Sequence, residues 1–271
     1  MIMEEFIKTI GSECSIGFSI GFSLLDTINI TWYSLSYIIG FILGIVYIKH
    51  ILRFIKNPPN KNLIDDLLVW VMAGTILGGR LGYVLLYNPI YYFYNPKKIL
   101  YVWEGGMSFH GALFGILIFI FLFTQARKIN IFKVADLVAC AAPIGIFFGR
   151  ISNFLNGELW GKETTSFFGI IFPCAGPELR HPSQLYEAFF EGLFIFIILL
   201  FFTRKFNILD RQGMATGMFC LMYSIIRTFI EYFYRVPDNN IGYIFQHYTM
   251  GMLLSFPLLI IGIILIIKNY R

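Results

Sequence analysis

Residues 134–162 read VADLVACAAPIGIFFGRISNFLNGELWGK, an apolar run that ends in a dense group of polar side chains. The apolar part, 134–150, has the character of a membrane-spanning helix, which takes about 20 mostly apolar residues. The polar part, 148–162, holds strong hydrogen-bonding side chains, namely Arg150, Asn153, Asn156, Glu158 and Trp160. A membrane protein has little reason to gather them at a helix end unless an anionic group is handled there. The stretch therefore predicts chemistry on a lipid headgroup.

The composition supports a membrane protein. Of the 271 residues, 57% are hydrophobic and 14% are charged, whereas soluble domains carry about 25% charged residues. The mean hydropathy is +0.70. The net charge of +5 is spread along the chain, so no nucleic-acid partner is expected. The four cysteines form no CxxC pair, which argues against a metal site, and the sequence leaves open whether Cys14 and Cys174 are bridged.

Seven apolar ranges are candidates for membrane spans, and they predict an all-α polytopic membrane protein with a single membrane domain over 1–271. The ranges are about 33–52, 67–87, 109–125, 134–150, 183–202, 213–232 and 248–267. The preceding residues, 1–32, lack the basic start of a cleaved signal peptide. They are expected to form an outward-facing arm.

Lysine and arginine divide unequally between the two sets of loops. Most lie in one set of short loops and at the C-terminus, as Lys49, Arg53, Lys56, Lys61, Arg127, Lys128, Lys133, Arg204, Lys205, Arg211, Lys268 and Arg271. Cytoplasmic loops carry such an excess. We therefore expect an outside N-terminus, a cytoplasmic C-terminus, and a periplasmic loop region at 150–182.

Charged residues inside the predicted spans are candidates for a functional site, because a charge in the membrane is costly. They are Arg80, Asp136, Glu187, Glu191, Arg227 and Glu231, with Arg150 at a helix end. An alternative is that they only pair with one another and hold the helices together. Asp136 is also near the start of its helix, where a carboxylate favours the helix dipole.

Tyr223, Arg227 and Glu231 are four residues apart and therefore share one face of a helix. Glu231 is predicted to hold Arg227 in place. Because arginine offers a fork of donors that matches a phosphate, we interpret Arg150 and Arg227 as a phosphate clamp. The alternative for Arg227 is a simple ion pair within the helix.

Three further positions are candidates for the functional site or for a helix cap. His110, at the outer start of the third span, is either a capping residue or a proton acceptor. The nearby glycines Gly105, Gly106 and Gly111 are predicted to allow a close backbone approach. Arg80, in GGRLGY, either binds a headgroup or extends toward the interface. Ser183 is predicted to cap the fifth span, with Tyr186 and Glu187 turned inward.

Seven motifs together resemble one bacterial enzyme family, phosphatidylglycerol–prolipoprotein diacylglyceryl transferase. In chain order they are WYSLSYIIGF (32–41), GGRLGY (78–83), GGMSFHGALFG (105–115), GRISNFLNGELWG (149–161), HPSQLYEA (181–188), Y-x3-R-x3-E (223–231) and RVPD (235–238). The likeness extends over about 15–267, and the fourth motif is the most specific.

The resemblance implies a seven-helix enzyme of the bacterial inner membrane. Such an enzyme moves the diacylglyceryl group of phosphatidylglycerol onto the lipobox cysteine of a prolipoprotein signal peptide; a thioether forms and glycerol phosphate leaves. By motif match, Arg150 is the implied lipid-binding arginine and Arg227 the second essential one. The other implied functional positions are His110, Tyr33, Asn153, Gly161, Glu158, Tyr223 and Glu231.

The chemistry requires stabilisation of a leaving phosphate and deprotonation of a thiol. Arg150 and Arg227 suit the first task in a low-dielectric site. His110 is the basic candidate for the second, and nearby arginines would also favour the thiolate. The predicted supporting residues are Asn153 and Tyr33, which orient the headgroup, and Glu158 and Glu231, which hold arginines. No metal, nucleotide or flavin motif is present, and the chemistry needs no cofactor.

Two positions depart from the family pattern, and two other functional classes remain open. Ala112 stands where a second glycine is usual, and Met252 stands in a segment where the family tends to show Gly-Gln. A transporter or flippase for an anionic lipid or solute would use the same arginines without breaking a bond. Transporters usually show an internal repeat, and none is found. A scaffold protein would use the buried charges only to join helices.

Overall fold

The structure is a computed structural model, and it describes residues 32–86, 89–101, 107–237, 242–244 and 247–270. The predicted N-terminal arm lies outside the described residues except for Trp32. The side chain of His110 is also outside the description, although its backbone belongs to a helix.

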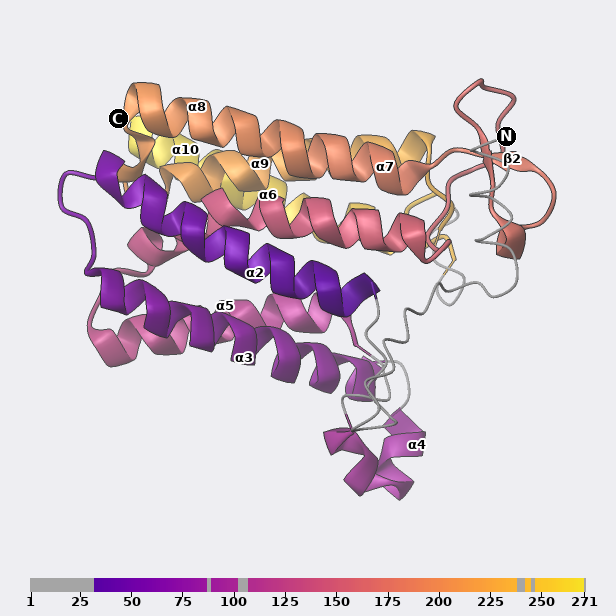
Figure 1. Ribbon diagram of the computed structural model, residues 1–271, viewed down its shortest axis with the longest axis horizontal. Helices are drawn as coiled ribbons and strands as arrows, with labels where there is room; N and C mark the ends of the chain where they lie inside the picture. Colours follow the sequence, from indigo (N-terminus) through magenta and orange to yellow (C-terminus); the bar gives the residue numbers. More distant parts are fainter. Residues whose placement is uncertain (1–31, 87–88, 102–106, 238–241, 245–246, 271) are drawn as a thin grey trace, which may run out of the picture. The chain divides into compact units, whose positions relative to one another are not determined.

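Long helices make up most of the described chain (Figure 1). In order they are α2 (Trp32–Ile51), α3 (Lys61–Leu86), α5 (Phe109–Arg127), α6 (Ile131–Leu155), the continuous segment of α7 (Ser183–Glu187), the π-helix η5 (Ala188–Phe194) and α8 (Ile195–Phe206), then α9 (Met214–Phe233) and α10 (Met250–Tyr270). Each of the seven predicted ranges overlaps one of these helical segments.

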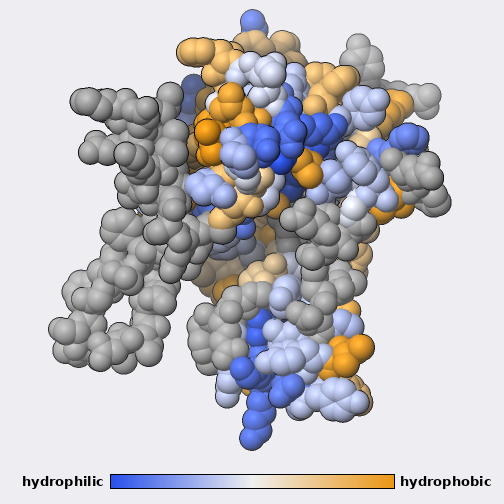
Figure 2. All heavy atoms as spheres, turned by 90° about the vertical axis from the view of Figure 1, so that its right-hand side faces the viewer, coloured by the Kyte–Doolittle hydropathy of each residue, from blue (hydrophilic) through white to orange (hydrophobic). Residues whose placement is uncertain are grey.

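Short elements connect the helices. They are the 3-10 helices η1 (Leu52–Phe54), η2 (Pro96–Leu100), η4 (Pro173–Ala175) and η6 (Ile208–Asp210), the helix α4 (Pro89–Tyr94), and the strands β1 (Ile170–Ile171) and β2 (Leu179–Arg180). The two strands pair antiparallel, with Ile170 opposite Arg180. This strand pair lies within the loop between α6 and α7. Figure 2 views the molecule from the end that carries β2, where hydrophilic residues gather among scattered hydrophobic ones.

Five helical segments among the described residues are long and apolar enough to cross a membrane. They are Trp32–Phe54, Lys61–Leu85, Ile131–Leu155, Ser183–Phe206 and Met250–Asn269. Large apolar side chains on them stay exposed, including Val69 and Leu85 on α3. Soluble monomers rarely leave such surfaces uncovered, whereas a bilayer covers them. The chain is therefore a multi-pass helical membrane protein, and the count of seven spans remains a prediction.

The chain forms two compact units. Of the described residues, one unit contains 32–54 and those from 136 onward, and the other contains those from 55 to 135. In the first unit, α9 packs along α10, where Gly262 lies so close that a Cβ would be 2.7 Å from the backbone nitrogen of Leu221. In the second unit, α3 packs along α5.

Two local predictions need correction. Ser183 does not cap α7; Pro182 is the N-cap, and the Ser183 hydroxyl donates to the carbonyl of Leu159 at 3.0 Å. Asp136 serves a helix other than its own. Its carboxylate accepts from the backbone of Gly213 (2.6 Å) and Thr216 (2.8 Å), so it caps α9. Neither partner lies near in sequence, which is why the pattern around each residue did not reveal it.

Glycines set the distance between α3 and α5. Gly74, Gly78 and Gly82 lie on one side of α3, four residues apart, and face Gly111 and Gly115 of α5. A Cβ on Gly78 would lie 2.5 Å from the Gly111 carbonyl and 2.6 Å from the Gly115 Cα. Small residues at this spacing let helix backbones meet in membranes. The predicted close backbone approach is confirmed for Gly111, whereas Gly105 and Gly106 lie outside the described residues.

We expect Gly78→Ala to destabilise the protein, because the new methyl group meets backbone that cannot move away. Overpacking of this kind costs about 1–3 kcal/mol. Gly145→Ala is the matched control, since it lies in α6 with no atom within 4 Å of a new Cβ; it should gain about 0.5–1 kcal/mol from helix propensity. Thermal unfolding of both variants in detergent tests this. Equal stabilisation by the two would contradict the close packing.

Candidate active site

Six charged side chains meet inside the first unit, and all six are largely buried. Arg150 comes from α6, Glu187 from α7, Glu191 from the π-helix η5, Arg227 and Glu231 from α9, and Arg235 from the residues just after α9. We call this set the arginine–carboxylate cluster. Three positive and three negative charges balance, as buried charges require.

Glu187 lies at the centre of the cluster and is fully buried. Its Oε1 accepts from Arg227 and from Arg235, each at 2.7 Å, and its Oε2 lies 3.1 Å from Arg150. One carboxylate therefore holds three guanidinium groups that come from three parts of the chain. Removing it would leave buried positive charges facing one another.

Glu191 and Glu231 supply the other two negative charges of the cluster, and they lie at different distances from the arginines. Glu191 lies 3.4 Å from Arg227 and 3.5 Å from Arg150. Glu231 makes a close contact of 2.5 Å with Arg227 and a longer one of 3.8 Å with Arg235. The predicted pairing of Glu231 with Arg227 on one helix face is present.

Arg150 is the least tightly held arginine of the cluster. Its described contacts are 3.1 Å to Glu187, 3.5 Å to Glu191 and 3.5 Å to the Asn153 side chain. Charge-assisted hydrogen bonds normally measure about 2.7–2.9 Å. The Arg150 guanidinium is thus oriented by carboxylates without being saturated by them, and an anion that arrives can compete for its donors.

A second polar group adjoins the cluster through Asn153. The Glu158 carboxylate accepts from the Tyr33 hydroxyl, from Asn153 at 3.3 Å and from Asn156 at 3.1 Å. Asn153 also donates to the Tyr33 hydroxyl. The structure therefore brings together α2, α6 and the loop after α6. The prediction that Glu158 holds an arginine finds no contact among the described residues, because these neutral side chains occupy its carboxylate.

The loop after α6 is shaped by a left-handed turn. Gly157 has φ of +64° and Leu159 has φ of +58°, and such a conformation costs a non-glycine residue about 1–3 kcal/mol. Hydrogen bonds from α7 hold the turn: Gln184 donates to the Glu158 carbonyl at 2.5 Å, and Ser183 to the Leu159 carbonyl. Side chains of the HPSQLYEA motif therefore hold the backbone conformation of the NGELWG motif.

Gly161 acts through its backbone. A Cβ there would lie 2.5 Å from the carbonyl oxygens of both His181 and Tyr234, so only glycine fits. Its N–H donates to the His181 carbonyl at 2.9 Å, and it forms a β-bridge with Arg235. The β-bridge joins the loop to the residues just after α9 and thereby fixes the backbone of Arg235. Partial burial lowers the pKa of the neighbouring His181.

Gly251 plays a similar part on α10. A Cβ there would lie 2.9 Å from the Glu231 Cδ and 3.3 Å from the Arg227 Nε. The departure at Met252 is next to this contact. Met252 also lines a cavity of about 810 Å³ beside Glu231, together with Lys162, Tyr232, Tyr243, His247 and Thr249. This cavity gives the cluster a polar neighbouring space.

The remaining predicted residues divide between the two units. In the first unit, Tyr223 lies on α9 one turn before Arg227 and interacts electrostatically with Arg227, Arg150 and Glu191. Its ring stacks on Phe219 with centroids 5.7 Å apart. Arg80 belongs to the second unit, where it is buried and donates to the carbonyls of Ile99 (2.9 Å) and Lys98 (2.5 Å). The backbone of His110 lies in the second unit as well, near the start of α5.

Arg235 and His247 reach the site although no sequence pattern predicts them as site residues. Arg235 was visible only as part of the RVPD motif, and its link to Glu187 spans 48 positions. His247 is exposed on the cavity beside Glu231. A histidine alone in a loop carries no signal in a single sequence. Glu187 and Glu191 were noted as charged residues, and only the fold shows that both face Arg150 and Arg227.

Apolar helices around a buried, charge-balanced cluster define a multi-pass membrane protein with an internal polar site. Residues 19–268 match the family model described as prolipoprotein diacylglyceryl transferase. A protein of Rickettsia bellii (strain OSU 85-389) is 49% identical over 240 residues, covering 89% of this chain and 91% of its own. A protein of Rickettsia typhi is 50% identical over 240 residues, covering 89% and 92%. Both are named phosphatidylglycerol–prolipoprotein diacylglyceryl transferase. The chain belongs to this family.

We expect Glu187→Gln to lower the stability of the protein strongly, because three buried arginines lose a shared negative charge. Breaking a buried ion pair from one side costs about 3–5 kcal/mol. Glu163→Gln is the control: Glu163 pairs with Arg180 at 3.0 Å, but its side chain is 64% exposed, and such pairs contribute at most about 1 kcal/mol. Thermal unfolding in detergent gives the comparison. Similar losses for both variants would show that Glu187 is not the centre of the cluster.

Proposed function

We propose that this protein transfers the diacylglyceryl group of phosphatidylglycerol to the thiol of the lipobox cysteine of a prolipoprotein. A carbon–sulfur bond forms at the glyceryl carbon, and the carbon–oxygen bond to the phosphate breaks. The electron pair of that bond leaves with glycerol phosphate, and the thiol proton goes to a base. The observation that carries the proposal is the loosely held Arg150 guanidinium beside a balanced set of charges.

Arg150 and Arg227 would stabilise the negative charge that develops on the leaving phosphate. Preorganised donors in a low-dielectric site are effective because they need no reorganisation during the reaction. Glu187 and Glu231 would keep the guanidinium groups in place. The phosphodiester would compete first for Arg150, whose shortest ion-pair contact is 3.1 Å, whereas Arg227 and Arg235 each have a contact of 2.7 Å to Glu187.

The neutral group around Glu158 would bind the glycerol part of the headgroup. Asn153 links Glu158 to Arg150, and Tyr33 contacts Glu158 and Asn153. Both side chains can exchange hydrogen bonds with hydroxyl groups. Gly161 would act by positioning Arg235. Tyr223 would reach the substrate from the same helix face as Arg227.

We propose His110 as the base for the thiol proton, with His247 as the alternative that the cavity beside Glu231 suggests. Arg80 is assigned a supporting role, because its described donors bind the backbone at 98–99. A reaction of this kind needs no cofactor.

We also propose seven spans in the bacterial inner membrane, with the N-terminus outside and the C-terminus in the cytoplasm. The distribution of lysine and arginine supports this orientation. So does Cys174 in the loop between α6 and α7, which is disulfide-bonded, since disulfides persist in oxidising compartments. The arginine–carboxylate cluster would then face the periplasmic half of the membrane.

The direct test incubates the purified protein with phosphatidylglycerol and a peptide that contains a lipobox cysteine. Mass spectrometry should find the mass of one diacylglyceryl group on the peptide cysteine. A peptide with serine in place of that cysteine is the control. A transporter or flippase would move the lipid and leave the peptide unchanged, and that result would overturn the proposal.

We expect Arg150→Ala to lower the transfer rate by about 10²–10³-fold, the typical loss for one donor that stabilises developing charge. Arg150→Lys should recover little activity, because lysine lacks the fork of donors. Arg127→Ala removes an exposed arginine paired with Asp66 and should retain normal rates. Initial rates at saturating lipid measure all three. Near-normal transfer by Arg150→Ala would exclude a phosphate clamp at this position.

The orientation is tested with two exposed positions of the first unit, Glu178 in the loop before α7 and Lys205 in the last turn of α8. In a background without other free thiols, Glu178→Cys should react with an impermeant thiol reagent in intact spheroplasts. Lys205→Cys should react only after the membrane is opened. The reverse pattern would place the cluster on the cytoplasmic side.

A further inference from the structure

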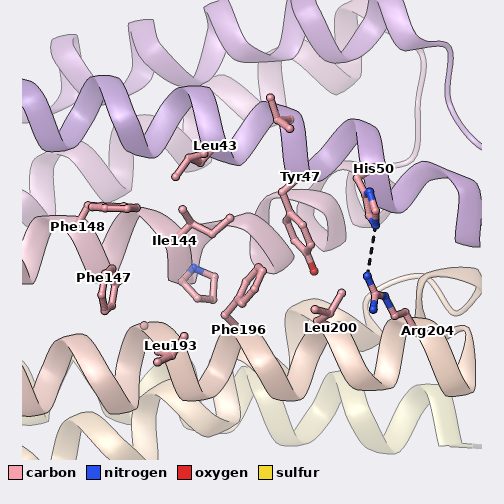
Figure 3. Close-up of a pocket in the computed structure, with 13 residues that line it drawn as sticks. Leu43, Tyr47, His50, Ile144, Phe147, Phe148, Leu193, Phe196, Leu200 and Arg204 are labelled. Atoms are coloured by element: carbon pink, nitrogen blue, oxygen red, sulfur yellow. Dashed lines mark hydrogen bonds between the residues drawn. The ribbon is translucent and has the colours of Figure 1, made fainter.

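A second cavity of about 470 Å³ lies in the first unit, between α2, α6 and the segment of η5 and α8 (Figure 3). Apolar side chains line most of its length, namely Leu43, Ile144, Phe147, Phe148, Leu193 and Phe196. We call it the α2–α8 groove. One end lies beside Phe147 and Phe148, just before Arg150 in α6. The other end has Tyr47, His50 and Arg204.

Tyr47 presents an unpaired polar atom to this groove. The residue is 8% exposed, and its hydroxyl is buried with no hydrogen-bond partner among the described residues. Its ring packs on Phe196, with centroids 4.8 Å apart, and Figure 3 shows Tyr47 pointing from α2 toward α8. A buried hydroxyl without a partner costs free energy, so a bound molecule with a suitable oxygen would satisfy it.

Positive charge gathers at the same end. Arg204 Nη2 lies 3.5 Å from His50 Nε2, and the Arg53 guanidinium contacts the same ring. Both guanidinium groups lie against the ring of Phe54, at 5.1 Å for Arg53 and 5.9 Å for Arg204. Neither arginine forms an ion pair with a carboxylate among the described residues. Two exposed guanidinium groups are therefore available to an anion.

This end is far from the arginine–carboxylate cluster. His50 follows Tyr33 by seventeen positions on the same helix, which corresponds to about 26 Å at 1.5 Å per residue. The hydrocarbon core of a bilayer is about 30 Å thick. Tyr33 belongs to the polar group around Glu158 that adjoins the cluster, so the two polar regions are separated along α2 by nearly the thickness of the hydrocarbon core.

We propose that the α2–α8 groove binds an anionic phospholipid of the leaflet opposite the arginine–carboxylate cluster. One acyl chain would lie in the groove, the Tyr47 hydroxyl would donate to an ester carbonyl, and Arg53 and Arg204 would bind the phosphate. Guanidinium groups match phosphate geometry. This site is separate from the proposed reaction and does not depend on it.

The size of the groove favours a lipid over a peptide helix. A 20-residue helix about 10 Å wide and 30 Å long occupies roughly 2,400 Å³, several times the groove volume of about 470 Å³. An acyl chain is narrow enough to enter between helices. The charge at the end then selects an anionic headgroup over a zwitterionic one.

The test uses native mass spectrometry of the purified, delipidated protein with phosphatidic acid and with phosphatidylcholine that carries the same acyl chains. Phosphatidic acid should bind the intact protein more tightly. The double variant Arg53→Gln/Arg204→Gln should weaken its binding by about tenfold or more, since hydrogen bonds to charged groups are lost. Lys205→Gln is the matched control, because it removes one charge from the same turn of α8 outside the groove lining; it should change binding less than twofold.

The variant Tyr47→Phe tests whether the Tyr47 hydroxyl binds a lipid or only lacks a hydrogen-bond partner. If the hydroxyl binds the lipid, the variant should weaken phosphatidic acid binding by several-fold. If the hydroxyl is only unsatisfied, the variant should unfold at a higher temperature and bind the lipid as before, which would count against the site. Equal binding of the two lipids, or no effect of the double arginine variant, would overturn the proposal. Transfer activity measured in the same samples reports separately on the proposed function.

Discussion

The contact of one buried carboxylate with three arginines is the constraint on which the rest of the structure depends. Glu187 holds Arg150, Arg227 and Arg235, which come from α6, α9 and the residues that follow α9. Inside a membrane, like charges this close would repel strongly without a shared counter-charge. The helices can therefore meet at this point only in an arrangement that places Glu187 between the arginines.

Backbone features make room for this arrangement. Gly161 lets the loop after α6 pass between His181 and Tyr234, and Gly251 lets α10 approach Glu231 and Arg227. The π-helix η5 carries Glu191 into the cluster, and Gly192 within it lies so close to α6 that a Cβ would be 2.9 Å from the Phe147 Cα. π-helical turns are rare and occur often at functional sites. In this protein the turn supplies a counter-charge to two arginines.

The same first unit has a different chemical character at its two ends. At one end the charges are buried and balanced, and in the proposed reaction the least saturated member, Arg150, would bind the phosphodiester that loses its glyceryl group. At the other end, Arg53 and Arg204 are exposed and form no ion pair with a carboxylate in the part of the chain that the structure describes, and they would suit a lipid that stays bound. α2 contributes to both ends, through Tyr33 and Tyr47. Hydrogen-bonding hydroxyls on one helix thus serve two separate lipid headgroups in the proposed scheme.

The helical ranges, the membrane class, the family resemblance and the Arg227–Glu231 pair could all be predicted from the amino-acid sequence. These depend on properties that repeat along the chain, such as runs of apolar residues, a four-residue spacing and ordered motifs. Only the folded chain shows that Glu187 bridges three arginines, that Asp136 caps α9, that Ser183 donates to Leu159, and that Glu158 binds Tyr33 and asparagines. The same holds for the Tyr47 hydroxyl, which has no hydrogen-bond partner among the described residues of the groove. The partners in these contacts are distant in the chain, and no local pattern encodes which distant side chain will neutralise a buried charge or accept a hydrogen bond.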